Sequence, residues 1–146
     1  MRYRKLDVNY DYTFGQGRSE ILHNTPAAVG QSVLTRLQLW QGEWFLDSTE
    51  GTPWLQKILS ANIKNTTPLY DQAIKSRVLT TQHVTALNDY SSNLNVTTRR
   101  LVVSMKIDTE YGGLSISATF APAGPAGFIP ALIFSNPLDS QYAPLI

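Results

Sequence analysis

Apolar residues recur at helical spacing in the first half of the chain. Thr25-Pro26 starts the first such stretch, because a threonine side chain can cap free helical amides and a proline at the first helical position loses no hydrogen bond. Four apolar residues follow along one helical face: Val29, Val33, Leu37 and Trp40. Gly42 then supplies a residue that can end a helix in the left-handed conformation. The pattern predicts an amphipathic helix over residues 26–40.

A second stretch repeats this design further along the chain. Thr67-Pro68 gives the same start signal, and Tyr70, Ile74 and Val78 follow at positions i, i+4 and i+8. We therefore expect a second amphipathic helix that ends near residue 80.

The segment between the two helices carries weaker signals. Glu43-Trp44-Phe45-Leu46-Asp47 predicts a short strand or extended crossing that the turn-forming residues 48–53 close. A brief helical segment is expected over residues 53–59. The predicted short strand, which follows Gly42 and starts at Glu43, thus separates two helices of similar construction.

After residue 80 the period changes from helical to alternating. Three alternating runs are present: Val84 and Ala86; Leu101, Val103, Met105 and Ile107; and Leu114, Ile116, Ala118 and Phe120. Residues 88–95, rich in Asn and Ser, and the link containing Tyr111-Gly112-Gly113 are short enough for antiparallel hairpins. The predicted fold class is α+β, with two amphipathic helices packed on a C-terminal three-stranded antiparallel meander.

Two further segments flank this domain of residues 20–120. Residues 1–19 predict an extended N-terminal arm, in which apolar residues from Val8 to Phe14 recur at every second position. Residues 121–146 form an apolar tail whose prolines argue against a regular element. Because Asp139 is its one charged residue, we expect the tail to be buried. It would lie against a partner or fold back over its own domain.

Composition removes several classes of function. The 146 residues contain 12 Lys and Arg and 11 Asp and Glu, a formal charge of +1, so neither nucleic acid nor a membrane is an expected partner. With no cysteine and only His23 and His83, no metal or cofactor site is expected. The sequence has no run of 18 apolar residues and no signal-peptide pattern, which indicates synthesis in the cytoplasm.

Few residues suggest catalysis. Glu43 and Asp47 form a carboxylate pair beside aromatic residues, the combination that glycoside hydrolysis uses. In a strand, however, positions i and i+4 lie about 13 Å apart, beyond the carboxyl separations of either hydrolytic geometry. We therefore expect no catalytic residue and assign Glu43 and Trp44 to a buried or partner-facing contact. Arg99 and Arg100 point to opposite faces of a strand and cannot bind one anion together, so we expect a solvated strand entrance or, with Arg100, a protein contact.

Three motifs carry a resemblance to a known family. They are Gln31-Ser32-Val33-Leu34-Thr35-Arg36-Leu37, Gly42-Glu43-Trp44-Phe45-Leu46-Asp47 and Gly51-Thr52-Pro53-Trp54. With the order of elements over residues 20–120, they resemble the small baseplate wedge proteins of contractile-tailed bacteriophages, which older annotation calls lysozyme-like. Relatives occur in type VI secretion baseplates. The resemblance implies a non-enzymatic subunit that joins the wedge to the tail and initiates the contractile sheath.

The resemblance also implies partners and a location. The partners would be the tail sheath protein and other baseplate wedge, hub or tube proteins, with several copies in a symmetric assembly at the virion tail baseplate. One departure concerns the family's Glu-Pro-Arg motif, which is Thr81-Gln82-His83 here. Its ionic contact cannot be carried over. Either neutral hydrogen bonds replace that contact, or the motif lies elsewhere.

The meander suggests where strands from sheath subunits could be added. Residues 114–120 contain no charge or proline and are expected to form an exposed edge with unpaired backbone groups. We expect Ser117 to lie at a pairing position of this edge. Six side chains are expected to fix the register or to contact the partner: Leu114, Ile116 and Phe120 on the edge, and Val102, Ser104 and Lys106 on one face of the preceding strand.

Two alternatives to a structural subunit remain. One is a peptidoglycan hydrolase that uses Glu43 and Asp47. The other is a free-standing soluble binding protein, whose tail would be protected without any partner.

Overall fold

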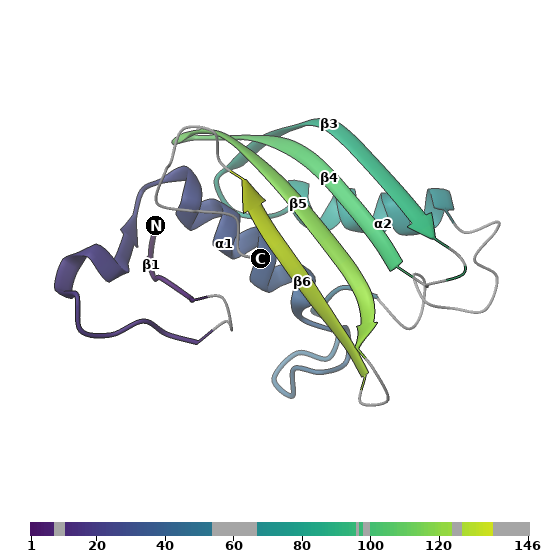
Figure 1. The fold of residues 1–146 in the computed structure, drawn as a ribbon, viewed down its shortest axis with the longest axis horizontal. Helices are drawn as coiled ribbons and strands as arrows, with labels where there is room; N and C mark the ends of the chain where they lie inside the picture. Colours follow the sequence, from purple (N-terminus) through teal and green to yellow (C-terminus); the bar gives the residue numbers. More distant parts are fainter. Residues whose placement is uncertain (8–10, 54–66, 96, 98–99, 124–126, 136–146) are drawn as a thin grey trace.

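A computed structural model describes residues 1–7, 11–53, 67–95, 97, 100–123 and 127–135. It has the expected α+β class. Two helices lie on one face of a four-stranded antiparallel sheet (Figure 1). The elements are α1 (Pro26–Gln38), α2 (Thr67–Leu79), β3 (Val84–Asn95), β4 (Arg100–Thr109), β5 (Gly112–Ala123) and β6 (Gly127–Ser135). The strand order β3-β4-β5-β6 follows the chain.

Helix α1 confirms the predicted start but ends earlier than expected. The Thr25 hydroxyl accepts a hydrogen bond from the Ala28 amide at 3.2 Å, with Pro26 at the start of the helix. Leu39 then adopts an extended conformation and closes the helix. Gly42 does have a positive φ of 92°, but it serves a turn outside the helix. Its predicted role as the helix stop is wrong.

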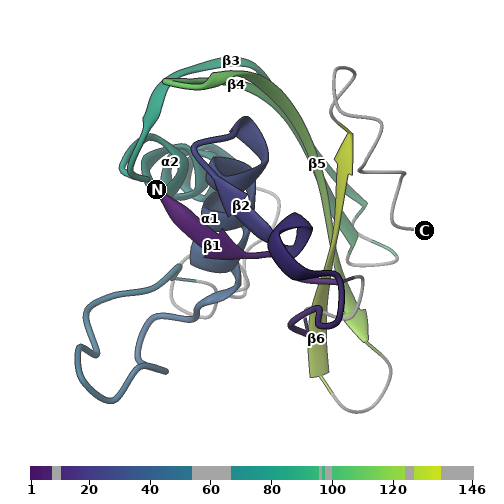
Figure 2. The same cartoon turned by 90° about the vertical axis from the view of Figure 1, so that its left-hand side faces the viewer.

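Helix α2 has the predicted apolar stripe. Tyr70, Ile74 and Val78 are all buried, with exposed fractions of 2% or less. They meet the buried face of α1 and the inward residues of β4 and β5. The cluster is completed by Val33, Leu34, Leu37, Leu101, Val103, Met105, Ile107, Leu114, Ile116 and Ala118. Figure 2 shows the sheet curling around the two helices, which occupy its concave side.

Strand β3 is longer than the sequence suggested. Residues 88–95, expected to be a hairpin link, belong to the strand and pair with β4. The register shifts between Asn88 and Ser91, and Asp89 has a positive φ of 46°. Asn and Ser signal turns because their side chains bond nearby backbone, yet a bulged edge strand tolerates the same residues.

Strand β6 was missed because its sequence contains proline. Its residues pair with β5 without a register shift, and Pro130 lies opposite Phe120. An edge strand accepts proline, because one side of its backbone needs no ladder bond. Part of the tail therefore folds back over its own domain, and the expectation of no regular element is wrong for residues 127–135. Residues 136–146 lie outside the described residues.

The pairing of β6 changes the position of β5 in the sheet. Ser117 pairs with Ser104 of β4 on one side and with Ile133 of β6 on the other. Residues 115–120 therefore pair on both sides, and the prediction that residues 114–120 form an exposed edge is wrong.

The N-terminal arm packs beside α1. Strand β1 (Arg2–Arg4) pairs antiparallel with β2 (Ile21–His23), and a short 3-10 helix, η1 (Gly17–Glu20), precedes β2. Leu6 and Tyr12 form a further bridge. Val8 and Tyr10, part of the alternation that predicted an extended arm, lie outside the described residues.

Candidate functional site

The sheet has two outer strands, and they differ in how they are protected. Among the described strands, β3 and β6 each pair with a single neighbour in this sheet. Each therefore has backbone N–H and C=O groups on its outer side that no strand of this sheet pairs with. Such a row is the structural requirement for adding a strand from another chain.

The edge formed by β3 carries features that discourage pairing. It has the bulge and left-handed Asp89 described above, and the Asp89 carboxylate lies 2.9 Å from Lys106 Nζ in an exposed ion pair. The Asn88 amide donates to the Asp108 carboxylate at 2.7 Å. Bulges and charges are devices by which natural sheets block edge-to-edge association. This edge is therefore a poor acceptor.

The edge formed by β6 lacks these devices. Its sequence, Gly-Phe-Ile-Pro-Ala-Leu-Ile-Phe-Ser, contains no charge, and its ladder with β5 is regular from Gly127 to Ser135. Its one feature that discourages pairing is Pro130, which has no backbone donor. Among the described residues, the outer edge expected on β5 thus lies on β6, one strand further along the chain.

The predicted contact residues on β5 point into the domain. Leu114 and Ile116 are 4% and 3% exposed and belong to the core beneath the sheet. They cannot fill pockets on a partner, because the alternation that faces them inward also buries them against the helices. Phe120 has its backbone in the ladder with Leu101 and Pro130. The side chains of Phe120 and Arg100 lie outside the described residues.

The outer face of the sheet carries the three β4 residues that were expected to share one face. Ser104 and Lys106 are exposed and Val102 is half-buried, so the three share the face opposite the helices. Ser104 Oγ lies 3.5 Å from Ser117 Oγ across the β4–β5 ladder. This face is a mainly polar surface.

Glu43 and Trp44 lie in a loop that follows α1, where the predicted strand is absent. The Glu43 carboxylate accepts a hydrogen bond from the Trp40 amide at 3.0 Å, and the Glu43 amide donates to the Trp40 carbonyl at 3.0 Å. Side-chain bonds of this kind favour turns over a ladder. The strand prediction for residues 43–47 is wrong for this reason, and Glu43 is exposed rather than buried.

The arrangement of the two carboxylates does not favour hydrolysis. Asp47 accepts hydrogen bonds from the Thr49 hydroxyl at 2.6 Å and from the Thr49 amide at 2.9 Å, and these bonds lower the pKa of Asp47. A general acid needs a raised pKa, which is the opposite shift. Glu43 and Asp47 each bond to their own turn, as structural residues do.

An ionic cluster at the base of this loop was not apparent in the sequence. Glu50 lies 2.7 Å from Arg77 on α2 and 3.6 Å from Arg36 on α1. Hydrogen bonding to Arg77 holds the pKa of Glu50 below its usual value, and burial lowers the pKa of Arg36. Thr52, fully buried, donates to the Arg36 carbonyl at 3.0 Å. The partners are distant in sequence, so no local motif reveals them.

The Thr81-Gln82-His83 segment connects α2 to β3, and its side chains make polar contacts with both helices and with Glu110. The buried Thr81 hydroxyl donates to the Arg77 carbonyl at 2.9 Å and accepts from Arg36 at 3.1 Å. His83, at a φ of 68°, places Nδ1 2.7 Å from the Glu110 carboxylate. A hydrogen bond from the charged Arg36 and a histidine–glutamate contact thus occur at the position where the family motif was expected.

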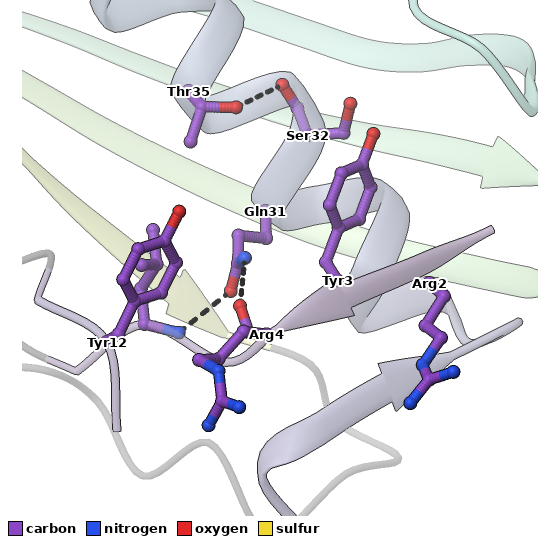
Figure 3. A pocket seen from close by; sticks show the side chains of 8 residues that line it. Arg2, Tyr3, Arg4, Tyr12, Gln31, Ser32 and Thr35 are labelled. Atoms are coloured by element: carbon purple, nitrogen blue, oxygen red, sulfur yellow. Dashed lines mark hydrogen bonds between the residues drawn. The ribbon is translucent and has the colours of Figure 1, made fainter. Parts of the chain in front are cut away.

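A groove lies between the N-terminal arm and α1. Figure 3 shows the Gln31 side chain between the rings of Tyr3 and Tyr12, donating to the Arg4 carbonyl at 2.8 Å and accepting from the Leu6 amide at 3.1 Å. Gln31 thereby binds two backbone groups of the arm, as a neighbouring strand would. The cavity has a volume of about 450 Å³.

The described residues contain neither a metal-binding cluster nor a membrane-spanning helix. Among the described residues, no group of three or more His, Asp or Glu side chains is placed to hold a metal ion. Within the same residues, no helix has the length and apolar character needed to cross a membrane.

Comparison with known proteins gave one match. A family model described as contractile injection system sheath initiator matches residues 2–112. No curated protein matches the chain. The matched region runs from β1 through both helices, β3 and β4 to the first residue of β5.

Proposed function

The chain belongs to the contractile injection system sheath initiator family, and from this premise we propose that it starts sheath assembly by accepting a strand from a sheath subunit on the outer edge of β6. In this role it is a structural subunit that joins the baseplate to the tail. Its partners are the sheath protein and other wedge, hub or tube proteins. Several copies act in a symmetric baseplate, in a phage tail or a related injection device.

The observation that carries this proposal is the contrast between the two sheet edges. Strand β6 offers a regular, uncharged row of backbone groups, whereas β3 has a bulge and an ion pair. Main-chain hydrogen bonds to β6 would supply affinity, and alternate side chains of the added strand would fix its register. The incoming strand would become the fifth strand of the sheet.

Proline substitutions in β6 test the proposal. Successive N–H groups of an antiparallel strand point to opposite sides, so of Ala131 and Leu132 one directs its N–H at β5 and the other at the open edge. The variant that loses the outward N–H, either Ala131→Pro or Leu132→Pro, should keep the thermal unfolding midpoint. We expect it to enter baseplates that then fail to nucleate sheath, as counted by electron microscopy.

The guarded edge provides the matched control. Ser91→Pro and Ser92→Pro change two neighbouring residues of β3, of which one directs its N–H at β4 and the other at the outer edge. The variant of the two that keeps the wild-type fold is the one that removes an outward N–H. Baseplates carrying it should nucleate sheath normally. Normal sheath on baseplates with the folded β6 variant, or loss of sheath with the folded β3 variant, would contradict the assignment.

A further inference from the structure

The loop of residues 39–52 exposes three consecutive apolar side chains, Trp44, Phe45 and Leu46. Their exposed fractions are 42%, 89% and 69%. We call these three residues the tip. Single exposed apolar residues are common, but a contiguous exposed run is typical of a binding surface. Aromatic residues, Trp above all, are the usual anchors of protein interfaces.

The loop that carries the tip is closed by backbone hydrogen bonds. The Thr52 amide donates to the Leu39 carbonyl at 2.7 Å, and the Gln41 amide donates to the Thr52 carbonyl at 3.0 Å. Gly51 permits this closure, because a Cβ at its position would lie 2.4 Å from the Gln41 nitrogen. The tip is therefore presented on an ordered base, so docking does not require the loop to be ordered first.

The charges around the tip are all negative. Glu43 and Asp47 flank the tip, and the loop of residues 39–52 contains no Lys or Arg. Within the described part of the chain, neither carboxylate forms an ion pair, whereas Glu50 at the base is matched by arginines. A surface complementary to the tip is therefore an apolar or aromatic groove with a positive rim.

The groove between the arm and α1 has this chemistry. Its lining includes Arg2, Tyr3, Leu6 and Tyr12 and contains no carboxylate. Arg4 also lines the groove, but its guanidinium lies 3.6 Å from the buried Glu20 carboxylate and 4.8 Å from the centre of the Phe14 ring. Among the described residues, Arg2 is therefore the arginine of this groove whose charge no carboxylate matches. Figure 3 shows the Arg2 and Arg4 guanidinium groups directed to the same side, away from α1. Tyr3 and Tyr12 are 38% and 62% exposed, so their rings can contact an incoming aromatic side chain.

We propose that the tip of one copy docks into the arm groove of a second copy. Tip and groove are different surfaces, so the contact is heterologous and links successive copies head to tail, closing into a ring where the rotation allows. Trp44 and Phe45 would pack against Tyr3 and Tyr12, with Glu43 and Asp47 near Arg2. The proposal stands apart from sheath initiation, because it concerns the isolated chain.

A disulfide trap tests the contact in the purified protein. The chain has no cysteine, so Ser48→Cys beside the tip and Thr35→Cys in the groove each introduce one thiol on an exposed residue. The two variants, carrying tags of different mass, are mixed and oxidised. We expect the mixed dimer to form at least about tenfold faster than the mixed dimer of Ser48→Cys with Leu79→Cys, an exposed control on α2.

Two further substitutions test whether the tip binds a second copy of this chain or another protein. Adding Phe45→Ser to the Ser48→Cys chain, or Arg2→Glu to the Thr35→Cys chain, should return cross-linking to the control rate. Equal rates for groove and control thiols would overturn the proposal. So would a Phe45→Ser chain that is excluded from baseplates while its cross-linking is unchanged, because another protein would then bind the tip.

Discussion

The two edges of the sheet show how one fold can both block and invite pairing. Strand β3 contains a bulge, a left-handed Asp89 and an ion pair from Asp89 to Lys106. Strand β6 runs straight along β5 and has no charged residue. Because both edges belong to one sheet, the difference does not come from the fold. It comes from the sequence of each outer strand, and under the proposed function it marks the side to which a sheath strand is added.

The guarded edge is also fixed to a helix. The Tyr90 hydroxyl of β3 donates to Asp71 of α2 at 2.8 Å, and Lys75 Nζ lies 4.4 Å from the centre of the Tyr90 ring. Burial raises the pKa of Tyr90, and the bond to Asp71 raises it further. The phenol therefore stays protonated and keeps donating. Strand β3 is thus held as the fixed end of the sheet.

The largest expected effect distinguishes the centre of the sheet from its edges. Ser117→Pro removes a donor from β5, which pairs on both sides, and leaves a ladder partner unsatisfied. We expect the free energy of unfolding to fall by more than about 2 kcal/mol. Urea denaturation measures this. If β5 were an exposed edge, stability would change little while sheath initiation was lost.

A smaller loss of stability is expected at the base of the loop of residues 39–52. It tests whether this base has a structural role that is separate from sheath initiation at the β6 edge. Glu50→Gln leaves the largely buried Arg77 without its charged partner, and we expect a loss of about 1 kcal/mol, discounted because Glu50 is one-third exposed. Since Arg77 lowers the pKa of Glu50, this stability is present above the unfolded-state pKa, about 4.3.

The same contribution should disappear as the pH falls through the lower folded-state pKa of Glu50. The wild type and Glu50→Gln should then approach equal stability in acid, measured by urea denaturation between neutral and acidic pH. Sheath initiation by Glu50→Gln should stay normal. Loss of initiation in a folded variant would mean that the loop takes part in it.

The smallest expected effect comes from removing the guard on β3. Asp89→Gly deletes the ion pair with Lys106 but relieves the left-handed conformation, which glycine adopts freely. An exposed pair contributes at most about 1 kcal/mol, so the two changes nearly cancel. Thermal unfolding and sheath initiation should both match the wild type. A marked change in either would show that the charge at this edge has a further role.

The helices were predictable because their signals are local. Thr25 and Pro26 mark the start of α1 within two residues, and the Tyr70, Ile74 and Val78 stripe needs only the helical period. The end of α1 was misplaced, because Leu39 leaves the helix to bond with Thr52, which is distant in sequence.

The strands and binding surfaces were less predictable, since their structure depends on neighbours. Pro130 suggested a break, but its place opposite Phe120 in an outer strand makes it acceptable. The Asn- and Ser-rich half of β3 suggested a turn for a similar reason. The open edge was therefore assigned to β5, one strand too early. Exposure of Ser104 and Lys106 was predictable, because alternation along β4 depends on the buried face alone.

Cross-linking to the sheath protein tests the central claim most directly. Single cysteines at Ile129, Ala131 and Ile133, which share one face of β6, would be paired with cysteines scanned along a sheath subunit in assembled particles. Because a disulfide requires Cβ atoms about 3.5–4.5 Å apart, a paired strand should give bonds at every second sheath position, in antiparallel or parallel register. The account predicts this ladder from β6 and none from cysteines at Ser91 and Asn93 of β3. A ladder from β3 with none from β6 would contradict it.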